Sequence, residues 1–192
     1  MTLLVVAHLS VAKWLDDIGL PQYKEAFLES RVDGAILHTM TFDDLISLNV
    51  TSKLHYKSIK HGIQILRENK FNTNVLVRRS PDDEEPSDQY DPEEVSLWTS
   101  HRVMQWLSSI DLSECTPNLR GSGVHGAIII HEPSFNSDLL ATLLSIPDSK
   151  TLLRRHLATH FNKLIGDTLN QEKCDYMAKY SPLLPSSKIQ VI

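Results

Sequence analysis

The sequence predicts an all-α protein built from two tandem five-helix bundles. The first observation is an internal repeat: the segment from Val11 to Leu20 returns from Val103 to Leu112, at an offset of 92 residues (103 − 11). The apolar spacing recurs while the polar residues differ, which is typical of two copies of one small domain with different surfaces. The second observation is that only 7 of the 192 residues are Gly. Because turn dipeptides are also rare, a strand-rich fold is disfavoured.

Helix-start signals divide the first copy, residues 9–70, into five short helices. Ser, Thr, Asp and Asn side chains cap helix N-termini, and Pro favours the first helical position. The expected caps and starts in this copy are Ser10, Pro21, Thr41, and Thr51 or Ser52. Gly19 is expected to end the first helix. The last helix carries an apolar stripe made of Leu54, Ile59, Ile63 and Leu66.

The second copy, residues 97–167, repeats this plan. Its expected caps are Thr99 or Ser100, Ser113, Asn136 or Ser137, and Asp148. Gly166 is expected to end the last helix. Trp14 and Trp106 occupy the same position of the repeat, so we expect them at equivalent sites in two cores.

The remaining segments are expected to be peripheral. Residues 1–8 form an N-terminal stub, residues 71–96 an acidic linker, and residues 168–192 a disordered tail. Residues 82–94 hold eight acids and three residues of 81–92 are Pro, a composition typical of solvated linkers. Within the linker, Arg78-Arg79-Ser80-Pro81 is either a phosphorylation site or an unmodified basic turn.

Several stretches resemble the sterile alpha motif (SAM) domains of the liprin-beta family. Residues 14–23 (WLDDIGLPQY) and 50–55 (VTSKLH) are similar to its second SAM domain, and residues 118–126 (NLRGSGVHG) and 150–162 (KTLLRRHLATHFN) to its third. The likeness covers about residues 10–166. Liprins carry three SAM domains after a coiled-coil half, so the resemblance implies a fragment, a short isoform or an incomplete gene model.

The resemblance also implies a function. It predicts a non-enzymatic, cytoplasmic scaffold that binds liprin-alpha or other SAM-containing proteins. Such a scaffold would help to organise receptor phosphatase complexes, presynaptic zones or adhesion sites, where its partners recruit it. Two alternatives stay open, namely homotypic SAM polymerisation and binding of RNA hairpins through a basic last helix. Each copy is close to neutral, whereas RNA-binding domains usually have a basic excess, so no nucleic acid is expected.

Charge is polarised within each copy, since acids dominate its first four helices and bases its last helix. SAM domains dock the start of the last helix (the end-helix surface) on the middle surface of another domain (the mid-loop). The end-helix residues are expected to be Lys53, Leu54, His55, Lys57, Lys150, Thr151, Arg154 and Arg155. The acidic mid-loop candidates are Asp33, Asp43, Asp44, Glu132 and Asp138. Complementary ends favour head-to-tail contact, although the charges could also merely solvate two faces.

No cofactor, metal or catalytic residue is expected. His156 and His160 have the helical spacing of a metal pair, but no third ligand accompanies them. The Gly-rich segment 121–126 follows no predicted strand and is interpreted as a turn rather than a phosphate cradle. The apolar run at residues 3–7 is too short to span a bilayer. With only two Cys, a disulfide framework is excluded and a reducing compartment is favoured.

Overall fold

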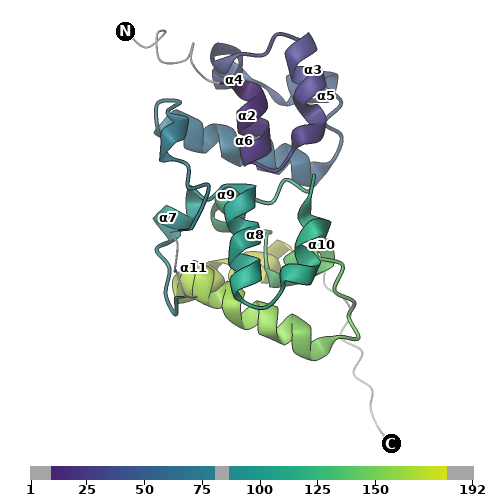
Figure 1. Ribbon diagram of the computed structural model, residues 1–192, viewed down its shortest axis with the longest axis vertical. Coiled ribbons are helices and arrows are strands. Elements are labelled where there is room, and N and C mark those ends of the chain that lie inside the picture. The colour runs from purple at the N-terminus through teal and green to yellow at the C-terminus, as the bar shows by residue number, and fades with distance from the viewer. Residues whose placement is uncertain (1–9, 81–86, 181–192) are drawn as a thin grey trace, which may run out of the picture.

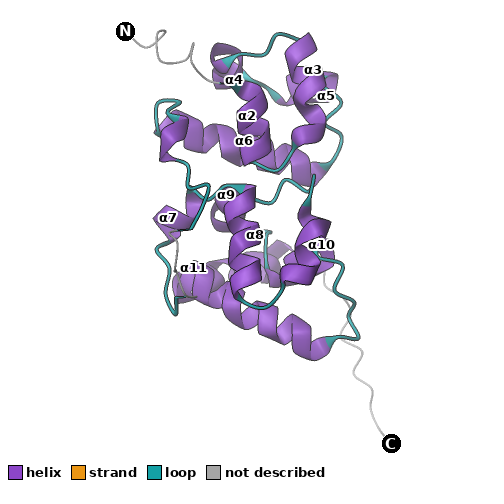
Figure 2. Cartoon of the chain, viewed as in Figure 1, coloured by secondary structure: helices purple, strands orange, loops and turns teal. Residues whose placement is uncertain are grey.

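The computed structural model describes residues 10–80 and 87–180. Across these residues, helices are joined by short loops and no strand forms (Figure 2). Among these residues, the backbones of Val77 and Trp98 pair in an isolated parallel β-bridge. The helices form two bundles that are stacked along the long axis of the molecule (Figure 1). The predicted all-α fold with two tandem helical bundles is therefore confirmed.

The first bundle follows the predicted helix starts. Its elements are α2 (Val11–Asp17), the 3₁₀ helix η1 (Pro21–Tyr23), α3 (Lys24–Glu29), α4 (Gly34–Thr39), α5 (Phe42–Ser47) and α6 (Lys53–Glu68). The side chains of Ser10, Thr41 and Ser52 accept hydrogen bonds from the first turns of α2, α5 and α6. Thr41 also forms a reciprocal capping box with Asp44. Local sequence signals thus set the start of each of these helices.

The first core is formed by buried residues from each of the helices α2 to α6. Trp14 is 1% exposed and packs with Phe27, Ile59 and Ile63. A Cβ atom at Gly62 would lie 3.0 Å from Cζ2 of Trp14, so a small residue on α6 lets the indole ring approach the helix. Burial of these large side chains is the main stabilising contribution, because none of the short helices is stable alone.

The second bundle starts earlier than predicted. Its elements are α7 (Pro92–Ser96), α8 (Ser100–Ser109), the 3₁₀ helix η3 (Ser113–Leu119), α9 (Gly126–His131), α10 (Ser137–Leu143) and α11 (Thr151–Tyr180). Trp106, also 1% exposed, lies in a separate core at the position that the repeat predicts. Thr99 and Asn136 cap α8 and α10 as expected.

Two predicted caps are wrong. Ser113 is itself the first residue of η3, and the preceding residue, Leu112, has no side-chain acceptor. Asp148 lies ahead of α11, which begins at Thr151, and its carboxylate instead forms a 2.9 Å ion pair with Arg154. The first of these helices therefore begins one residue earlier than the capping signal predicts, and α11 begins two residues later.

The linker and the tail also differ from the prediction. Within residues 71–96, the chain forms the 3₁₀ helix η2 (Thr73–Val75) and α7, and Val95 of α7 is buried in the second core. The tail was expected to be disordered from residue 168, but α11 continues to Tyr180 beyond a non-helical Gly166. Leu169 packs against the second core and Lys173 is buried, which explains why this segment is held as a helix. Residues 1–9, 81–86 and 181–192, which include the predicted stub, lie outside the described residues.

Candidate interaction surfaces

The two domains meet at a contact that we call the seam. In the seam, α6 of the first domain packs on α9 of the second, and α2 also contacts α8 (Figure 1). Leu54, at the start of α6, packs against the core of the second domain. The two bundles are therefore joined by side-chain packing as well as by the connecting chain.

A buried carboxylate lies at the centre of the polar contacts in the seam. Glu132, which follows α9, is 7% exposed. Its carboxylate accepts hydrogen bonds from Lys57 Nζ at 2.6 Å and from Ser134 Oγ, and lies 3.1 Å from Nε2 of His61. Burial by itself would raise the pKa of Glu132, but the hydrogen bonds from His61, Lys57 and Ser134 outweigh it and hold the pKa well below its usual range. Glu132 is thus ionised and paired across the seam.

The C-terminal part of α11 reaches the same place. Lys173 donates a hydrogen bond of 2.5 Å from Nζ to the backbone oxygen of Glu132. Burial lowers the pKa of the Lys173 ammonium to about 8. The residues that follow Gly166 therefore brace the loop that carries the seam carboxylate.

Backbone contacts add to these side-chain contacts. Gly123 donates a hydrogen bond of 3.1 Å to the carbonyl of Gly19, and Gln22 donates one of 2.8 Å to the carbonyl of Gly121. His125 is fully buried, and its Nε2 lies 3.1 Å from the carbonyl oxygen of Ser58. The Gly-rich segment 121–126 is therefore a turn, as the sequence predicts, and it contacts the first domain.

The connecting chain is fixed to both domains. Arg78 makes a bidentate pair with Asp17 of α2, at 2.9 and 2.8 Å, and this pairing raises the pKa of the guanidinium. Next to it, the backbone of Val77 exchanges hydrogen bonds with Leu97 and Thr99 of the second domain, at 2.9 and 3.0 Å. Neither contact is signalled by local sequence, since both join segments far apart in the chain.

The end-helix residues of the first copy lie at or beside the seam. Lys57 and Leu54 are part of it, while Lys53 is exposed. His55 is half-buried, its Nδ1 lies 2.8 Å from the hydroxyl of Tyr23, and burial lowers its pKa. The structure thus pairs two residues from opposite predicted sets, the end-helix Lys57 and the mid-loop candidate Glu132, within one chain.

The end-helix residues of the second copy are mostly exposed. Lys150, Thr151 and Arg155 are exposed around Leu152, which is 74% exposed. Arg154 instead contacts its own domain. It donates hydrogen bonds to the carbonyl oxygen of Ile146 and forms ion pairs with Asp148 and, at 3.8 Å, with the mid-loop candidate Asp138. We call Lys150, Thr151, Leu152 and Arg155 the basic end.

The acidic candidates of the first copy lie at the other end of the molecule, on α4 and α5 (Figure 1). Asp33 caps α4, Asp44 takes part in the capping box of α5, and Asp43 is exposed beside it. The same region carries four exposed large apolar side chains, which are Leu28, Ile36, Phe42 and Ile46. We call these seven residues, on α3 to α5, the acidic–apolar end.

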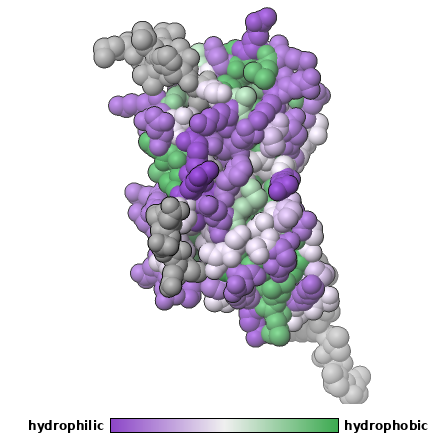
Figure 3. Space-filling model, in the orientation of Figure 1, coloured by the Kyte–Doolittle hydropathy of each residue, from purple (hydrophilic) through white to green (hydrophobic). Residues whose placement is uncertain are grey.

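Hydrophobic residues are visible near both ends of the molecule, at the top and at the bottom of the view in Figure 3. Exposed apolar groups next to charges are characteristic of protein-interaction surfaces. Sequence reasoning found the charged residues but missed the apolar ones. In the sequence, Phe42 and Leu152 look like the buried residues of the apolar repeat. Phe42 is nevertheless 53% exposed, and an exposed apolar residue can be told from a buried one only when it is known which helix faces are covered.

The other motifs have structural roles in the described residues. His156 lies with Nε2 2.7 Å from the carbonyl of Ile110, and its ring packs against that of His160 at 4.6 Å between centroids. Within residues 10–80 and 87–180, no group of three His, Cys, Asp or Glu side chains is placed to hold a metal ion. Over the same residues, every helix is too short or too polar to cross a membrane.

Comparisons with known proteins support the two-domain reading. Residues 5–67 match the SAM domain (Sterile alpha motif), and residues 95–165 match a second SAM domain (Sterile alpha motif). The chain is 60% identical to Liprin-beta-1 of Mus musculus over 167 residues, which are 87% of this chain and 17% of that protein.

More distant relatives share the same tandem region. The chain is 45% identical to Kazrin of Homo sapiens over 153 residues, 79% of this chain and 19% of that protein. It is 33% identical to Liprin-alpha-4 of Homo sapiens over 155 residues, 80% of this chain and 13% of that protein. The chain thus spans less than a fifth of the length of each of these relatives.

Proposed function

Because this chain belongs to the SAM-domain proteins and is a member of the liprin-beta family, we propose that it is a non-enzymatic scaffold unit that binds liprin-alpha or another SAM-containing protein. Through such partners it would be recruited in the cytoplasm to receptor phosphatase complexes, presynaptic zones or adhesion sites. Tandem SAM domains and likeness to Liprin-beta-1 support a role in protein interaction.

One observation carries the proposal. Two complementary surfaces are buried against each other in the seam. One is the basic start of α6, and the other is the acidic surface around Glu132. The complementary pair stays exposed at opposite ends of the molecule, as the basic end on α11 and the acidic–apolar end on α3 to α5 (Figure 1). The chain would therefore offer two unlike surfaces to partners, and the contact inside the chain supports the pairing of a basic helix start with an acidic surface.

Physical chemistry favours docking at these ends. At the basic end, the N-terminus of α11 adds positive potential to Lys150 and Arg155, which attracts an acidic partner surface. Leu152 supplies an apolar anchor there, and Phe42 does so at the acidic–apolar end. Charges around the anchors would set the rate of encounter and the choice of partner, while apolar burial would supply most of the affinity.

Calorimetry with the purified chain and liprin-alpha SAM domains tests the proposal. We expect binding that weakens as salt rises from about 50 to 300 mM, because exposed charges are screened over about one Debye length. Leu152→Ala with Arg155→Glu changes the basic end, and Phe42→Ala with Asp43→Lys changes the acidic–apolar end. We expect at least one double variant to bind about tenfold more weakly or worse, a change of about 1.4 kcal/mol.

Lys60→Glu is the matched control, since Lys60 is an exposed base on α6 that belongs to neither end. Variants of Lys57 are unsuitable as binding tests because they also break the seam. Wild-type affinity in both double variants would contradict the proposal. Light scattering of the chain alone separates a second outcome: concentration-dependent assembly that both double variants abolish would identify a second copy of this chain as the partner.

A further inference from the structure

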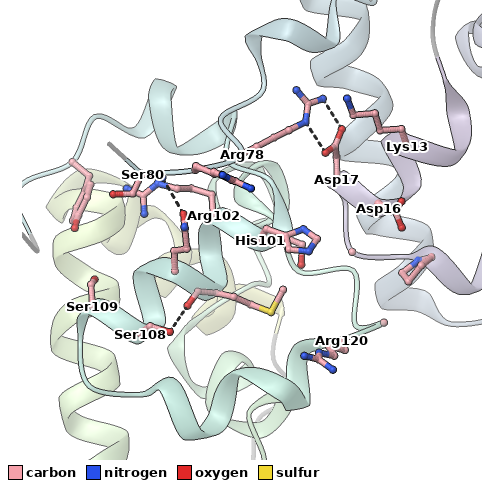
Figure 4. Close-up of a pocket in the computed structure, with 18 residues that line it drawn as sticks. Lys13, Asp16, Asp17, Arg78, Ser80, His101, Arg102, Ser108, Ser109 and Arg120 are labelled. Atoms are coloured by element: carbon pink, nitrogen blue, oxygen red, sulfur yellow. Dashed lines mark hydrogen bonds and ion pairs between the residues drawn. The ribbon is translucent and has the colours of Figure 1, made fainter. Parts of the chain in front are cut away.

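A basic groove runs between the two domains beside the connecting chain. Its volume is about 1000 Å³, and it is lined by α2 and α8 together with residues 78–80 (Figure 4). The cations along it are Lys13, Arg78, Arg79, Arg102 and Arg120. Of the residues that the structure describes, the acids along it are Asp16 and Asp17, which are paired with Lys24 at 2.5 Å and with Arg78, respectively. Among the described residues that line the groove, the Lys and Arg side chains therefore outnumber the acids.

Ser80 lies at one end of this groove. Its backbone N–H donates a hydrogen bond of 2.9 Å to Oε1 of Gln105 on α8. Arg102 precedes Gln105 by three residues, so both side chains are on the same face of that helix. The guanidinium of Arg102 lies over the Trp98 ring, 3.9 Å from its centroid. Figure 4 shows Ser80 and Arg102 at the same end of the groove, and the exposed Arg79 adjoins Ser80 in the chain.

We propose that Ser80 is a phosphorylation site whose phosphate is received by the arginines of the groove. The half-buried Ser80 is followed by Pro81, which is the pattern that proline-directed serine kinases recognise. In the reaction, Oγ of Ser80 bonds to the γ-phosphorus of ATP, the bond from that phosphorus to ADP breaks, and the hydroxyl proton leaves to the kinase base.

The groove suits a phosphate for electrostatic reasons. Phosphoserine carries a charge of about −1.5 to −2 and three strong acceptor oxygens. Guanidinium groups bind phosphate through two parallel N–H···O bonds, which are stronger than neutral hydrogen bonds. Arg79 and Arg102 can therefore approach the phosphate from the chain and from α8, respectively.

The consequence is a firmer connection between the domains. Arg78 already holds the connecting chain to Asp17 of the first domain, and Ser80 already holds it to Gln105 of the second. A phosphate bound to Arg102 would add a charge-assisted link to the second domain only two residues after the link to the first. Phosphorylation would thus stiffen the seam without touching either exposed end.

The first experiment asks whether a kinase reaches Ser80. The native chain is incubated with ATP and a proline-directed serine kinase, and a synthetic peptide of residues 74–88 is treated in parallel. Mass spectrometry should locate one phosphate on Ser80 in the native chain, and Ser80→Ala should remove it. Labelling of the peptide without labelling of the native chain would overturn the proposal.

The second experiment asks whether the groove receives the phosphate. Phosphorus NMR of the chain with phosphoserine at position 80 gives the second pKa of the phosphate, in native buffer and in urea. The unfolded chain is the matched control because it has the same neighbours in sequence. We expect the native pKa to be lower by about one unit, since nearby cations favour the dianion.

Arg79→Gln and Arg102→Lys should each move the native value back toward the unfolded value. Arg79 is exposed, so its replacement keeps the test valid even if the Arg102 variant fails to fold. Lys60→Gln should leave the value unchanged. Equal pKa values in the native and unfolded chains, or native values that neither arginine variant alters, would overturn the proposal.

Discussion

Gly123 of the second domain donates its backbone N–H to the carbonyl oxygen of Gly19 in the first, at 3.1 Å. Both glycines have positive φ, +77° at Gly19 and +75° at Gly123. A Cβ atom at Gly19 would lie 2.6 Å from Oγ of Ser100, and one at Gly123 would lie 2.9 Å from Oγ of Ser58. The domains therefore touch main chain to main chain, where no side chain larger than hydrogen fits.

Gly123→Ala should weaken the seam. Left-handed backbone costs a non-Gly residue about 1–2 kcal/mol, and overpacking against Ser58 and Leu20 adds a comparable amount. Urea unfolding should show the loss of stability. Gly166→Ala is the control, because Gly166 also has positive φ but no atom within 4 Å of its Cβ position. Equal losses in the two variants would mean that the contact across the seam adds nothing to the backbone strain.

Glu132→Gln should destabilise the seam by about 3–5 kcal/mol, since it leaves Lys57 near a buried site without its counter-charge. Lys57→Met should partly rescue that variant, and the two changes should be non-additive by about 0.5–3 kcal/mol in a double-mutant cycle. Asp138→Asn serves as a control, because its 3.8 Å pair with Arg154 is largely exposed. Strict additivity of the Glu132 and Lys57 changes would show that the pair has no coupling.

Trp14→Ala should unfold the first domain at a lower temperature than the second. Loss of a large buried side chain costs about 3–5 kcal/mol, which approaches the total stability of a domain this small. Calorimetry should then resolve two transitions, because the two cores are separate clusters. Leu152→Ala, which changes an exposed residue, should leave the thermogram unchanged. A single shifted transition in the Trp14 variant would instead mean that the seam makes the domains unfold together.

Stability should fall as the pH drops from about 6.5 to about 4. Burial, as the largest cause, lowers the pKa of His125 from 6.5 to about 4. In that window the unfolded chain binds a proton that the folded chain excludes, so acid favours unfolding. The loss of folding free energy from His125 is complete below pH 4 and is at most about 3 kcal/mol.

Urea unfolding across this pH range checks the prediction. His125→Asn should flatten the pH profile, because it removes the group that titrates differently in the two states. His101→Asn replaces an exposed His and should keep the wild-type slope. A profile of the His125 variant that parallels that of the wild type would assign the acid sensitivity to other groups.

The sequence by itself determined the fold class, the number of domains and most helix starts. Ser10, Thr41, Ser52, Thr99 and Asn136 cap helices as expected, because a capping side chain acts only on the backbone two or three residues away. Trp14 and Trp106 reach equivalent buried sites because the apolar repeat selects one face of each helix. Signals of this kind act within a few residues, so they can be read directly from the chain.

Only the tertiary structure decided which predicted surfaces meet. Lys57 and Glu132 were expected to face outside partners, yet they pair with each other across 75 residues of sequence. Residues beyond 167 looked like a polar tail, but Lys173 gains a buried hydrogen bond to Glu132 that holds α11 in place. Such contacts depend on the packing of whole domains, and the free energy of a buried pair exists only once both partners are brought together. Local composition carries no information about that placement.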